Sequence, residues 1–290
     1  MRIYSNYVVF WALVTASAWA RPAGAQGVAV ESLGALPGAG LDEAHQVDVY
    51  LPPGYASNPA RRYPVLYAND GQDLATAQFP VVMSTLLASG RMAPVIVVAI
   101  YSTESRTPEY ATAGRPALLA DGGQAAAYQR FVVDSVMPRV SARYRVQVGA
   151  GHTAIMGWSL GGLSAFDLAW NHPDRFGIVG VFSGSLWWRD NDGTAQERVA
   201  GRIVHRMVRA GPSRPALRFW FMAGRQEEED DRDGNGVIDV IQDTRELIEL
   251  LVGQGHREGG DIEWHEVDGR HELATWARML PAFLAWAFPT

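Results

Sequence analysis

Short apolar runs alternate with amphipathic stretches over most of this chain. Seven runs rich in β-branched and aromatic residues predict strands, at Gln46–Leu51, Pro64–Ala68, Val95–Tyr101, Thr153–Met156, Ile178–Phe182, Leu217–Met222 and Ile262–Val267. Apolar residues at three- and four-residue spacing predict helices, at Val81–Ser89, Gln124–Val140, Leu160–Trp170, Glu197–Arg209, Arg245–Gly253 and Ala274–Phe288. Strands separated by helices are typical of a mostly parallel, buried sheet with helices on both faces.

Two polar segments rich in Gly are predicted to be ordered loops, at Ser102–Gly123 and Ser183–Gly193. In open α/β sheets, ligands bind outside the carboxyl ends of the strands, so we expect these loops to lie beside a functional site. No internal repeat or long linker divides the chain. We therefore predict one α/β domain over residues 26–290.

One pentapeptide carries the strongest chemical signal. Gly157-x-Ser159-x-Gly161 lies between a predicted buried strand and a predicted helix. A serine at such a turn needs a strained backbone with small neighbours, and the helix that follows points its N-terminal N–H groups at a forming oxyanion. This context predicts that Ser159 is a nucleophile, whereas an isolated GxSxG pattern indicates little.

Composition limits how that serine could be activated. The chain has no cysteine, and all 25 basic residues other than histidine are arginine. Thiol nucleophiles, disulfides, Schiff-base lysines and Ser–Lys dyads are therefore excluded. The base for Ser159 must be one of seven histidines or a carboxylate.

His271 is the best-placed histidine. It lies between the last predicted strand and the C-terminal helix, and in α/β-hydrolase order the histidine follows the serine and the acid. His265 belongs to a strand pattern, His172 ends the helix after Ser159, and His152 precedes the serine's strand at the wrong end. The remaining three lie far from any carboxyl end of a strand: His45, His205 and His256.

An acidic run after the strand Leu217–Met222 supplies the candidate acid. Glu227 is the first carboxylate after the glycine turn, and Glu228 and Asp230 are alternatives. An orienting carboxylate fixes the imidazole in the tautomer that accepts the serine proton. The rest of the run, as far as Asp233, is interpreted as a solvated loop.

Two backbone N–H groups are predicted to form an oxyanion hole. One belongs to Leu160, directly after the serine, and the other to Gln72, in a loop after the strand Pro64–Ala68. The alternative for the second loop is a simple Asx turn. Trp158, Trp187 and Trp188 are candidates for lining a substrate pocket, and the alternative is that they pack in the core.

These motifs together resemble the "putative esterase" family of α/β-hydrolases, which includes enterochelin esterases, S-formylglutathione hydrolase, feruloyl esterases and mycolyltransferases. The resemblance begins near Val47, and the matching segments are 49–55, 63–67, 69–72, 157–162, 171–176, 223–227 and 269–276. It implies an α/β-hydrolase fold. It also implies Ser159 as nucleophile, His271 as base, Glu227 as acid, and the Gln72 and Leu160 amides as oxyanion donors.

The segment 231–239 fits the first nine positions of a calcium loop, with Asp231, Asp233, Asn235 and Asp239 as candidate ligands. Position twelve is Gln242 instead of a bidentate glutamate. The alternative is an acidic turn that leads into the helix Arg245–Gly253, capped by Asp243 or Thr244. A bound calcium would be structural, because the predicted catalysis requires no cofactor.

Residues 1–25 predict a secretory signal peptide. Arg2 is followed by an apolar stretch, Tyr7–Ala20, and by a small-residue cleavage site before Gln26. The apolar stretch is short for a membrane span, and an uncleaved anchor is the alternative. Export to the periplasm or the medium of a bacterium is therefore expected. With a formal net charge of −6 and no basic cluster, the chain has no nucleic-acid-binding feature.

The sequence therefore predicts an exported serine hydrolase that cleaves carboxylic esters. Two other functions remain open. The same acyl-enzyme could pass its acyl group to an alcohol, or the fold could bind siderophores or carbohydrates without catalysis. The sequence does not define which ester is cleaved or the oligomeric state.

Overall fold

The computed structural model describes residues 27–114 and 123–290. The predicted signal peptide and part of the predicted loop Ser102–Gly123 lie outside the described residues. Within the described ranges, none of the helices is long and apolar enough to cross a bilayer.

An eight-stranded sheet forms the centre of the molecule, with strand order β1-β2-β4-β3-β5-β6-β7-β8. β1 pairs antiparallel with β2 and β2 antiparallel with β4, and all other neighbours are parallel. The strands are β1 Ala29–Leu36, β2 His45–Leu51, β3 Val65–Ala68, β4 Ile96–Ile100, β5 Thr153–Trp158, β6 Ile178–Phe182, β7 Arg218–Gly224 and β8 Ile262–Val267. The predicted fold class is therefore confirmed.

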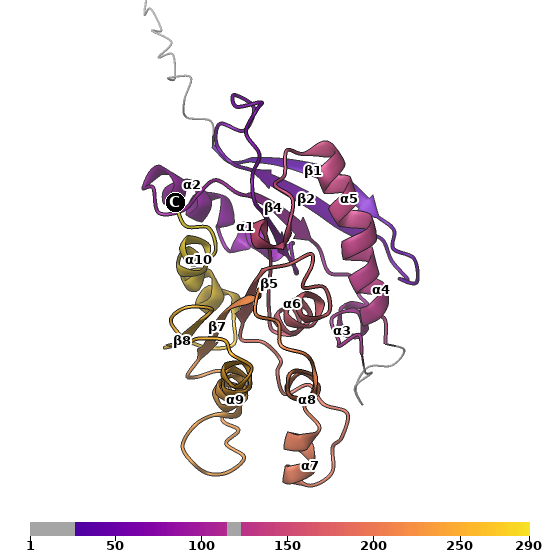
Figure 1. The fold of residues 1–290 in the computed structure, drawn as a ribbon, viewed down its shortest axis with the longest axis vertical. Helices are drawn as coiled ribbons and strands as arrows, with labels where there is room; N and C mark the ends of the chain where they lie inside the picture. Colours follow the sequence, from indigo (N-terminus) through magenta and orange to yellow (C-terminus); the bar gives the residue numbers. More distant parts are fainter. Residues whose placement is uncertain (1–26, 115–122) are drawn as a thin grey trace, which may run out of the picture.

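Helices cover both faces of the sheet (Figure 1). They are α1 Asp73–Thr76, α2 Phe79–Ala88, α3 Arg106–Glu109, α4 Ala125–Arg130, α5 Met137–Arg143, α6 Leu160–Asn171, α7 Ala195–Ala200, α8 Ile203–Ala210, α9 Asp239–Gly253 and α10 Leu273–Ala287. Side chains of α1, α2 and α10 pack on one face, and those of α4, α5, α6, α8 and α9 on the other. Alternate residues of each strand enter the two cores, as the pleat requires; Val65 and Tyr67 join one core, and Leu66 and Ala68 the other.

Several elements differ from their prediction. β1 is not among the predicted strands, because it is a partly exposed edge strand whose register shifts between Ser32 and Gly34. The helix predicted at Glu197–Arg209 is two helices, and Arg202 between them has an extended backbone. The helix predicted at Gln124–Val140 includes a π-helical segment, Phe131–Val136, between α4 and α5.

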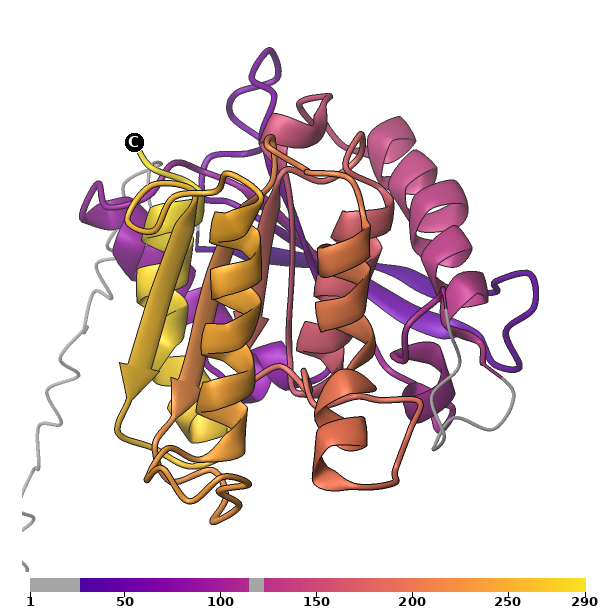
Figure 2. The ribbon, with the colours of Figure 1, turned by 60° about the horizontal axis from the view of Figure 1, so that its bottom comes forward.

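The carboxyl ends of the parallel strands lie at one edge of the sheet. Figure 2 shows the arrowheads of β7 and β8 pointing toward the end of the molecule where α7 and the loop before α9 lie. Loops after β3, β5, β6, β7 and β8 therefore meet at this edge, which is where the predicted site residues lie.

Candidate functional site

Ser159 lies at a sharp turn between β5 and α6. Its φ of 56° and ψ of −126° are values that non-glycine residues rarely adopt. The turn is possible because Gly157 has no side chain, since a Cβ there would lie 2.2 Å from the carbonyl oxygen of Gly161. This close approach lifts the Ser159 hydroxyl to the carboxyl edge of the sheet, as the GxSxG pattern predicts.

His271 connects Ser159 to an acid. Its Nε2 lies 2.9 Å from Ser159 Oγ, and its Nδ1 lies 2.9 Å from Glu227 Oε2. The three side chains come from the loops after β5, β7 and β8, which are not adjacent in sequence. The structure therefore brings together the serine, the histidine and the first of the three candidate acids.

Glu227 is held in place from the side opposite to His271. Its side chain is 2% exposed, and its Oε1 accepts hydrogen bonds from the Ser183 hydroxyl and from the Gly224 backbone N–H. Ser183 Oγ in turn accepts a hydrogen bond of 2.8 Å from Trp276 Nε1. One carboxylate oxygen is therefore occupied by donors, and the other is free to accept from His271.

Ser183 and Trp276 were not among the predicted site residues. Ser183 directly follows β6, at the same sheet edge as Ser159, and has a φ of 47°. Trp276 packs edge-on against the His271 ring at 5.1 Å and stacks on Trp158 at 5.8 Å. The position of Ser183 directly after a parallel strand could have identified it as a candidate site residue. Nothing in the sequence predicts its hydrogen bond with Trp276.

Gln72 and Leu160 carry the two N–H groups that are predicted to form an oxyanion hole. Gln72 is the N-cap of α1, and Leu160 is the first residue of α6. Within residues 27–114 and 123–290, neither backbone N–H donates to a protein acceptor. Both donors therefore remain available to a ligand.

The loop that carries Gln72 is attached to its surroundings at several points. Gly71 N–H donates to the Ile100 carbonyl at 2.8 Å, and a Cβ on Gly71 would lie 2.6 Å from the Ala99 backbone. The Gln72 side chain donates to Ser102 Oγ and accepts from the Ser102 N–H. These contacts fix the loop against its neighbours, and its role in an oxyanion hole stays a prediction.

The other histidines have structural surroundings. His205 is buried, its Nε2 lies 2.8 Å from the Asp243 carbonyl, and burial lowers its pKa to about 3. Burial also lowers the pKa of His172 and of His256. At His45, burial opposes the charged form, but hydrogen bonds with Glu109 and Tyr101 outweigh it and raise the pKa. His271 is the histidine that contacts Ser159.

Two of the three tryptophans proposed for the pocket are core residues. Trp158 and Trp188 are buried, and Trp158 also donates from Nε1 to Asp73 Oδ2 at 3.1 Å. The pocket prediction is wrong for these two, because the strand and the loop that carry them turn these rings inward. Trp187 is 36% exposed and lines a cavity.

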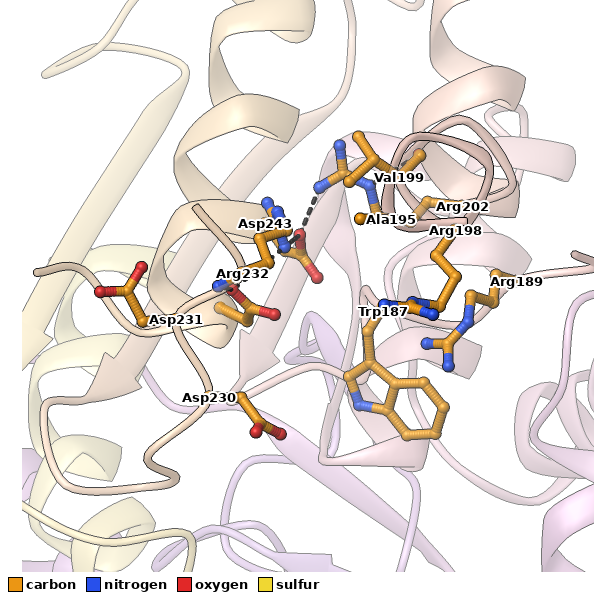
Figure 3. Close-up of a pocket in the computed structure, with 11 residues that line it drawn as sticks. Trp187, Arg189, Ala195, Arg198, Val199, Arg202, Asp230, Asp231, Arg232 and Asp243 are labelled. Atoms are coloured by element: carbon orange, nitrogen blue, oxygen red, sulfur yellow. Dashed lines mark hydrogen bonds and ion pairs between the residues drawn. The ribbon is translucent and has the colours of Figure 1, made fainter. Parts of the chain in front are cut away.

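This cavity, of about 330 Å³, lies between two loops of the site (Figure 3). Figure 3 shows Trp187, Arg189 and Arg198 on one side and Asp230 and Asp231 on the other. One wall follows Ser185, whose N–H donates to the Ser159 carbonyl at 3.1 Å, and the other follows Glu227 in sequence. The cavity is therefore strongly polar, and its lining residues do not include Ser159, His271 or Glu227.

The floor of the cavity is an ion-pair cluster. Arg202 and Arg232 both contact Asp243, which is buried, and both contact Glu246. Asp243 lies inside α9, which begins at Asp239 and not at Arg245. The predicted capping role of Asp243 or Thr244 is therefore wrong, since the helix starts earlier in order to place Asp243 against the two arginines.

The predicted calcium ligands lie in a turn closed by its own hydrogen bonds. Asp231 accepts from the N–H groups of Asn235 and Gly236, and Asn235 Oδ1 accepts from the Val237 N–H. Asp239, in the first turn of α9, accepts from the Arg232 N–H. In the part of the chain that the structure describes, no three His, Cys, Asp or Glu side chains are grouped so that they could hold a metal ion. Calcium binding stays a prediction.

Comparisons with known proteins show the family and the fold. A family model described as "Putative esterase" matches residues 38–287. The iron(III) enterobactin esterase of Escherichia coli strain CFT073 is 29% identical over 145 residues, which cover 50% of this chain and 32% of that protein. The endo-1,4-β-xylanase/feruloyl esterase of Xylanibacter ruminicola is 26% identical over 149 residues, 48% of this chain and 19% of that protein. The chain thus spans a third or less of these two relatives.

Among solved structures, the enterobactin esterase of Shigella flexneri, crystallised in the presence of enterobactin, superposes with a TM-score of 0.71. The match covers 91% of this chain and 59% of that chain, at 22% sequence identity. At this identity the likeness concerns the fold. The α/β-hydrolase architecture predicted from the motifs is confirmed.

Proposed function

The chain belongs to this family of esterases, and on that premise we propose that Ser159, His271 and Glu227 cleave carboxylic esters through an acyl-enzyme. The observation that carries the proposal is the continuous hydrogen-bonded line from Glu227 Oε2 through both ring nitrogens of His271 to Ser159 Oγ. The N–H of Leu160, the residue after Ser159, and the N–H of Gln72 donate to no protein acceptor in the described residues, which supports their proposed role as oxyanion donors. Such an arrangement suits nucleophilic attack on a carbonyl.

In the first half of the reaction, Ser159 Oγ attacks the ester carbonyl carbon while His271 Nε2 accepts the hydroxyl proton. The carbonyl oxygen becomes an oxyanion that accepts hydrogen bonds from the Leu160 and Gln72 amides. The tetrahedral intermediate collapses, and the C–O bond to the alcohol breaks as His271 returns the proton to the leaving oxygen. Glu227 accepts from Nδ1–H throughout, which holds the ring in the reactive tautomer.

In the second half, water attacks the acyl-enzyme. His271 Nε2 takes a proton from the water, the second oxyanion forms in the same site, and collapse restores the Ser159 hydroxyl and releases the acid. His271 is 38% exposed, so solvent water and an ester have direct access to it. No cofactor takes part in this sequence of steps.

Two further parts of the proposal concern the substrate and the location. The names of the matched relatives make feruloyl esters and enterobactin-type catecholate esters the first substrates to test. The polar cavity lined by Trp187 lies between the loops after β6 and β7, which also carry Ser183 and Glu227, and part of such an ester would lie there. We also propose export after cleavage before Gln26, which intact-mass measurement of the protein recovered from culture medium or periplasm would test.

The decisive experiment is active-site labelling with a fluorophosphonate, together with hydrolysis of nitrophenyl, feruloyl and catecholate esters. We expect labelling and hydrolysis by the native protein and neither by Ser159→Ala. Ser213→Ala is the matched control, because its hydroxyl only caps the Gln254 carbonyl at an exposed site. Equal labelling of Ser159→Ala would contradict Ser159 as the nucleophile, and no labelling of the native protein would make a non-catalytic binding protein the better hypothesis.

A further inference from the structure

A buried carboxylate lies unusually close to the proposed oxyanion hole. Asp70 is 1% exposed and precedes Gly71 and Gln72 in the loop after β3. A Cβ on Gly161 would lie 2.5 Å from Asp70 Oδ2. The carboxylate therefore touches the first turn of α6, two residues beyond the nucleophile.

Such a charge would oppose catalysis if it were unpaired. The oxyanion carries a full negative charge next to the Leu160 and Gln72 amides, and like charges repel strongly where water is excluded. A second carboxylate in the same loop, Asp73, has its pKa raised by burial, with a further contribution from the charge of Asp70. The loop that supplies an oxyanion donor thus also brings two acids.

Arg106 of α3 supplies the opposing charge. Its Nε and Nη2 donate to the two oxygens of Asp70 at 2.7 and 2.8 Å, which is the bidentate geometry of a strong guanidinium–carboxylate pair. The Arg106 side chain is 29% exposed. Burial lowers its pKa, but the hydrogen bond to Asp70 and the Asp70 charge outweigh that effect and raise it.

The same loop is attached to the nucleophile helix through a second set of hydrogen bonds. Asp70 N–H donates to the Tyr110 hydroxyl at 3.0 Å, and the Tyr128 hydroxyl donates to Asn69 Oδ1 at 2.7 Å. Asn69 Nδ2 then donates to the Gly161 carbonyl at 2.9 Å. Arg106 therefore acts on a segment whose position relative to Ser159 is already defined from the other side.

We propose that Arg106 is a positioning residue for ester hydrolysis, which fixes the loop 69–73 through Asp70 and neutralises that carboxylate beside the oxyanion. Arg106 acts through Asp70 and does not touch the reacting atoms. The inference rests on the function proposed for Ser159, and it assigns part of the oxyanion site's electrostatics to a residue more than 50 positions before Ser159 in sequence.

The test is a double-mutant cycle on kcat and KM for a nitrophenyl ester. Arg106→Gln removes the charge and leaves Asp70 unpaired, so we expect kcat to fall about 100-fold, as when one oxyanion donor is lost, with KM little changed. Asp70→Asn combined with Arg106→Gln removes both charges, and we expect kcat to return to within about tenfold of the native value. Arg106→Lys keeps the charge without the bidentate geometry and should be intermediate.

Arg143→Gln is the matched control, because it breaks an exposed pair with Glu31 and should leave kcat unchanged. Circular dichroism and fluorophosphonate labelling report folding and an intact Ser159. If the double variant is as slow as Arg106→Gln, or Arg106→Gln equals the native enzyme, the proposed role is wrong. If Arg106→Gln does not fold, Arg106→Lys is the test variant. A native kcat in Arg106→Lys would also contradict the positioning role of Arg106. Absence of labelling in the native protein would instead contradict the function of Ser159.

Discussion

Two acidic, glycine-containing loops at the carboxyl edge of the sheet look alike in sequence and differ in structure. The loop 69–73 follows β3, and the loop 228–238 follows β7. In the first, Asn69, Asp70 and Asp73 each bond to another element, namely α6, α3 and β5. In the second, Asp231 and Asn235 bond mainly to backbone groups of the same turn.

This difference shows that the number of acidic residues in a loop does not identify which carboxylate is functional. A carboxylate becomes useful to a histidine when burial and fixed donors orient it, and the donors come from distant segments. Glu227 precedes the second loop directly in sequence, but its hydrogen bonds resemble those of the first loop. It begins the acidic run, but it accepts hydrogen bonds from Ser183 and Gly224, as Asp70 accepts them from Arg106.

The largest expected effect compares two neighbouring glutamates. Glu227→Gln presents an amide to His271 and favours the wrong ring tautomer, so we expect kcat for a nitrophenyl ester to fall about 10³- to 10⁴-fold. Glu228→Gln is the control, because Glu228 Oε1 accepts from the Val240 N–H, and glutamine retains that acceptor. Similar losses in both variants would mean that the acid is not assigned correctly within the run.

The second comparison places a methyl group in each loop. In Gly71→Ala the new Cβ meets the Ala99 backbone at 2.6 Å, so the loop must move, and we expect about a 100-fold loss of kcat with the Gln72 amide displaced. Gly234 has a φ of +68°, and a Cβ added to it would meet no atom within 4 Å. Gly234→Ala should therefore cost about 1 kcal/mol of stability and leave kcat unchanged, as thermal unfolding and initial rates would show. An active Gly71→Ala enzyme would contradict the role of the loop.

The third prediction concerns the donors that distinguish Glu227 from Glu228. Ser183→Ala removes one of two donors to Glu227 Oε1, so we expect about a tenfold loss of kcat. Trp276→Phe keeps a ring against His271 and removes only the N–H that donates to Ser183, and about a twofold loss is expected. A larger effect of Trp276→Phe than of Ser183→Ala would indicate that the ring, and not the hydrogen bond, orients the histidine.

Much of the fold, and the grouping of Ser159, His271 and Glu227, could be predicted from the sequence, for identifiable reasons. Buried parallel strands are continuous apolar runs, and the GxSxG turn needs glycine at Gly157 because backbone atoms of α6 lie 2.2 Å from its missing Cβ. The order of serine, acid and histidine along the chain then indicated His271. These signals are local, or depend on which edge of a parallel sheet a loop occupies.

What the sequence could not indicate depends on contacts between distant segments. Ser183 lies 44 residues before Glu227 and 93 before Trp276, and only the folded sheet brings them together. Arg202 interrupts a helical pattern to reach Asp243, 41 residues later, which also explains the early start of α9. For Trp158 the sequence left the pocket and the core as alternatives, because strand alternation alone does not tell which face α10 covers.

The smallest expected effect tests the calcium prediction for the second loop. Both oxygens of Asp231 already accept backbone N–H groups, and Arg232 places a positive charge between Asp239 and Asp243. Because these carboxylate oxygens already have partners, a cation would add little order to the loop. We therefore expect about 1 mM calcium added after EDTA to change the melting temperature by less than about 1 °C. Asp231→Asn, which keeps one oxygen acceptor, should respond identically. An increase of several degrees that Asp231→Asn abolishes would show that the loop 228–238 binds calcium. The two loops would then differ in what holds them, a metal ion in one and contacts with other elements in the loop 69–73.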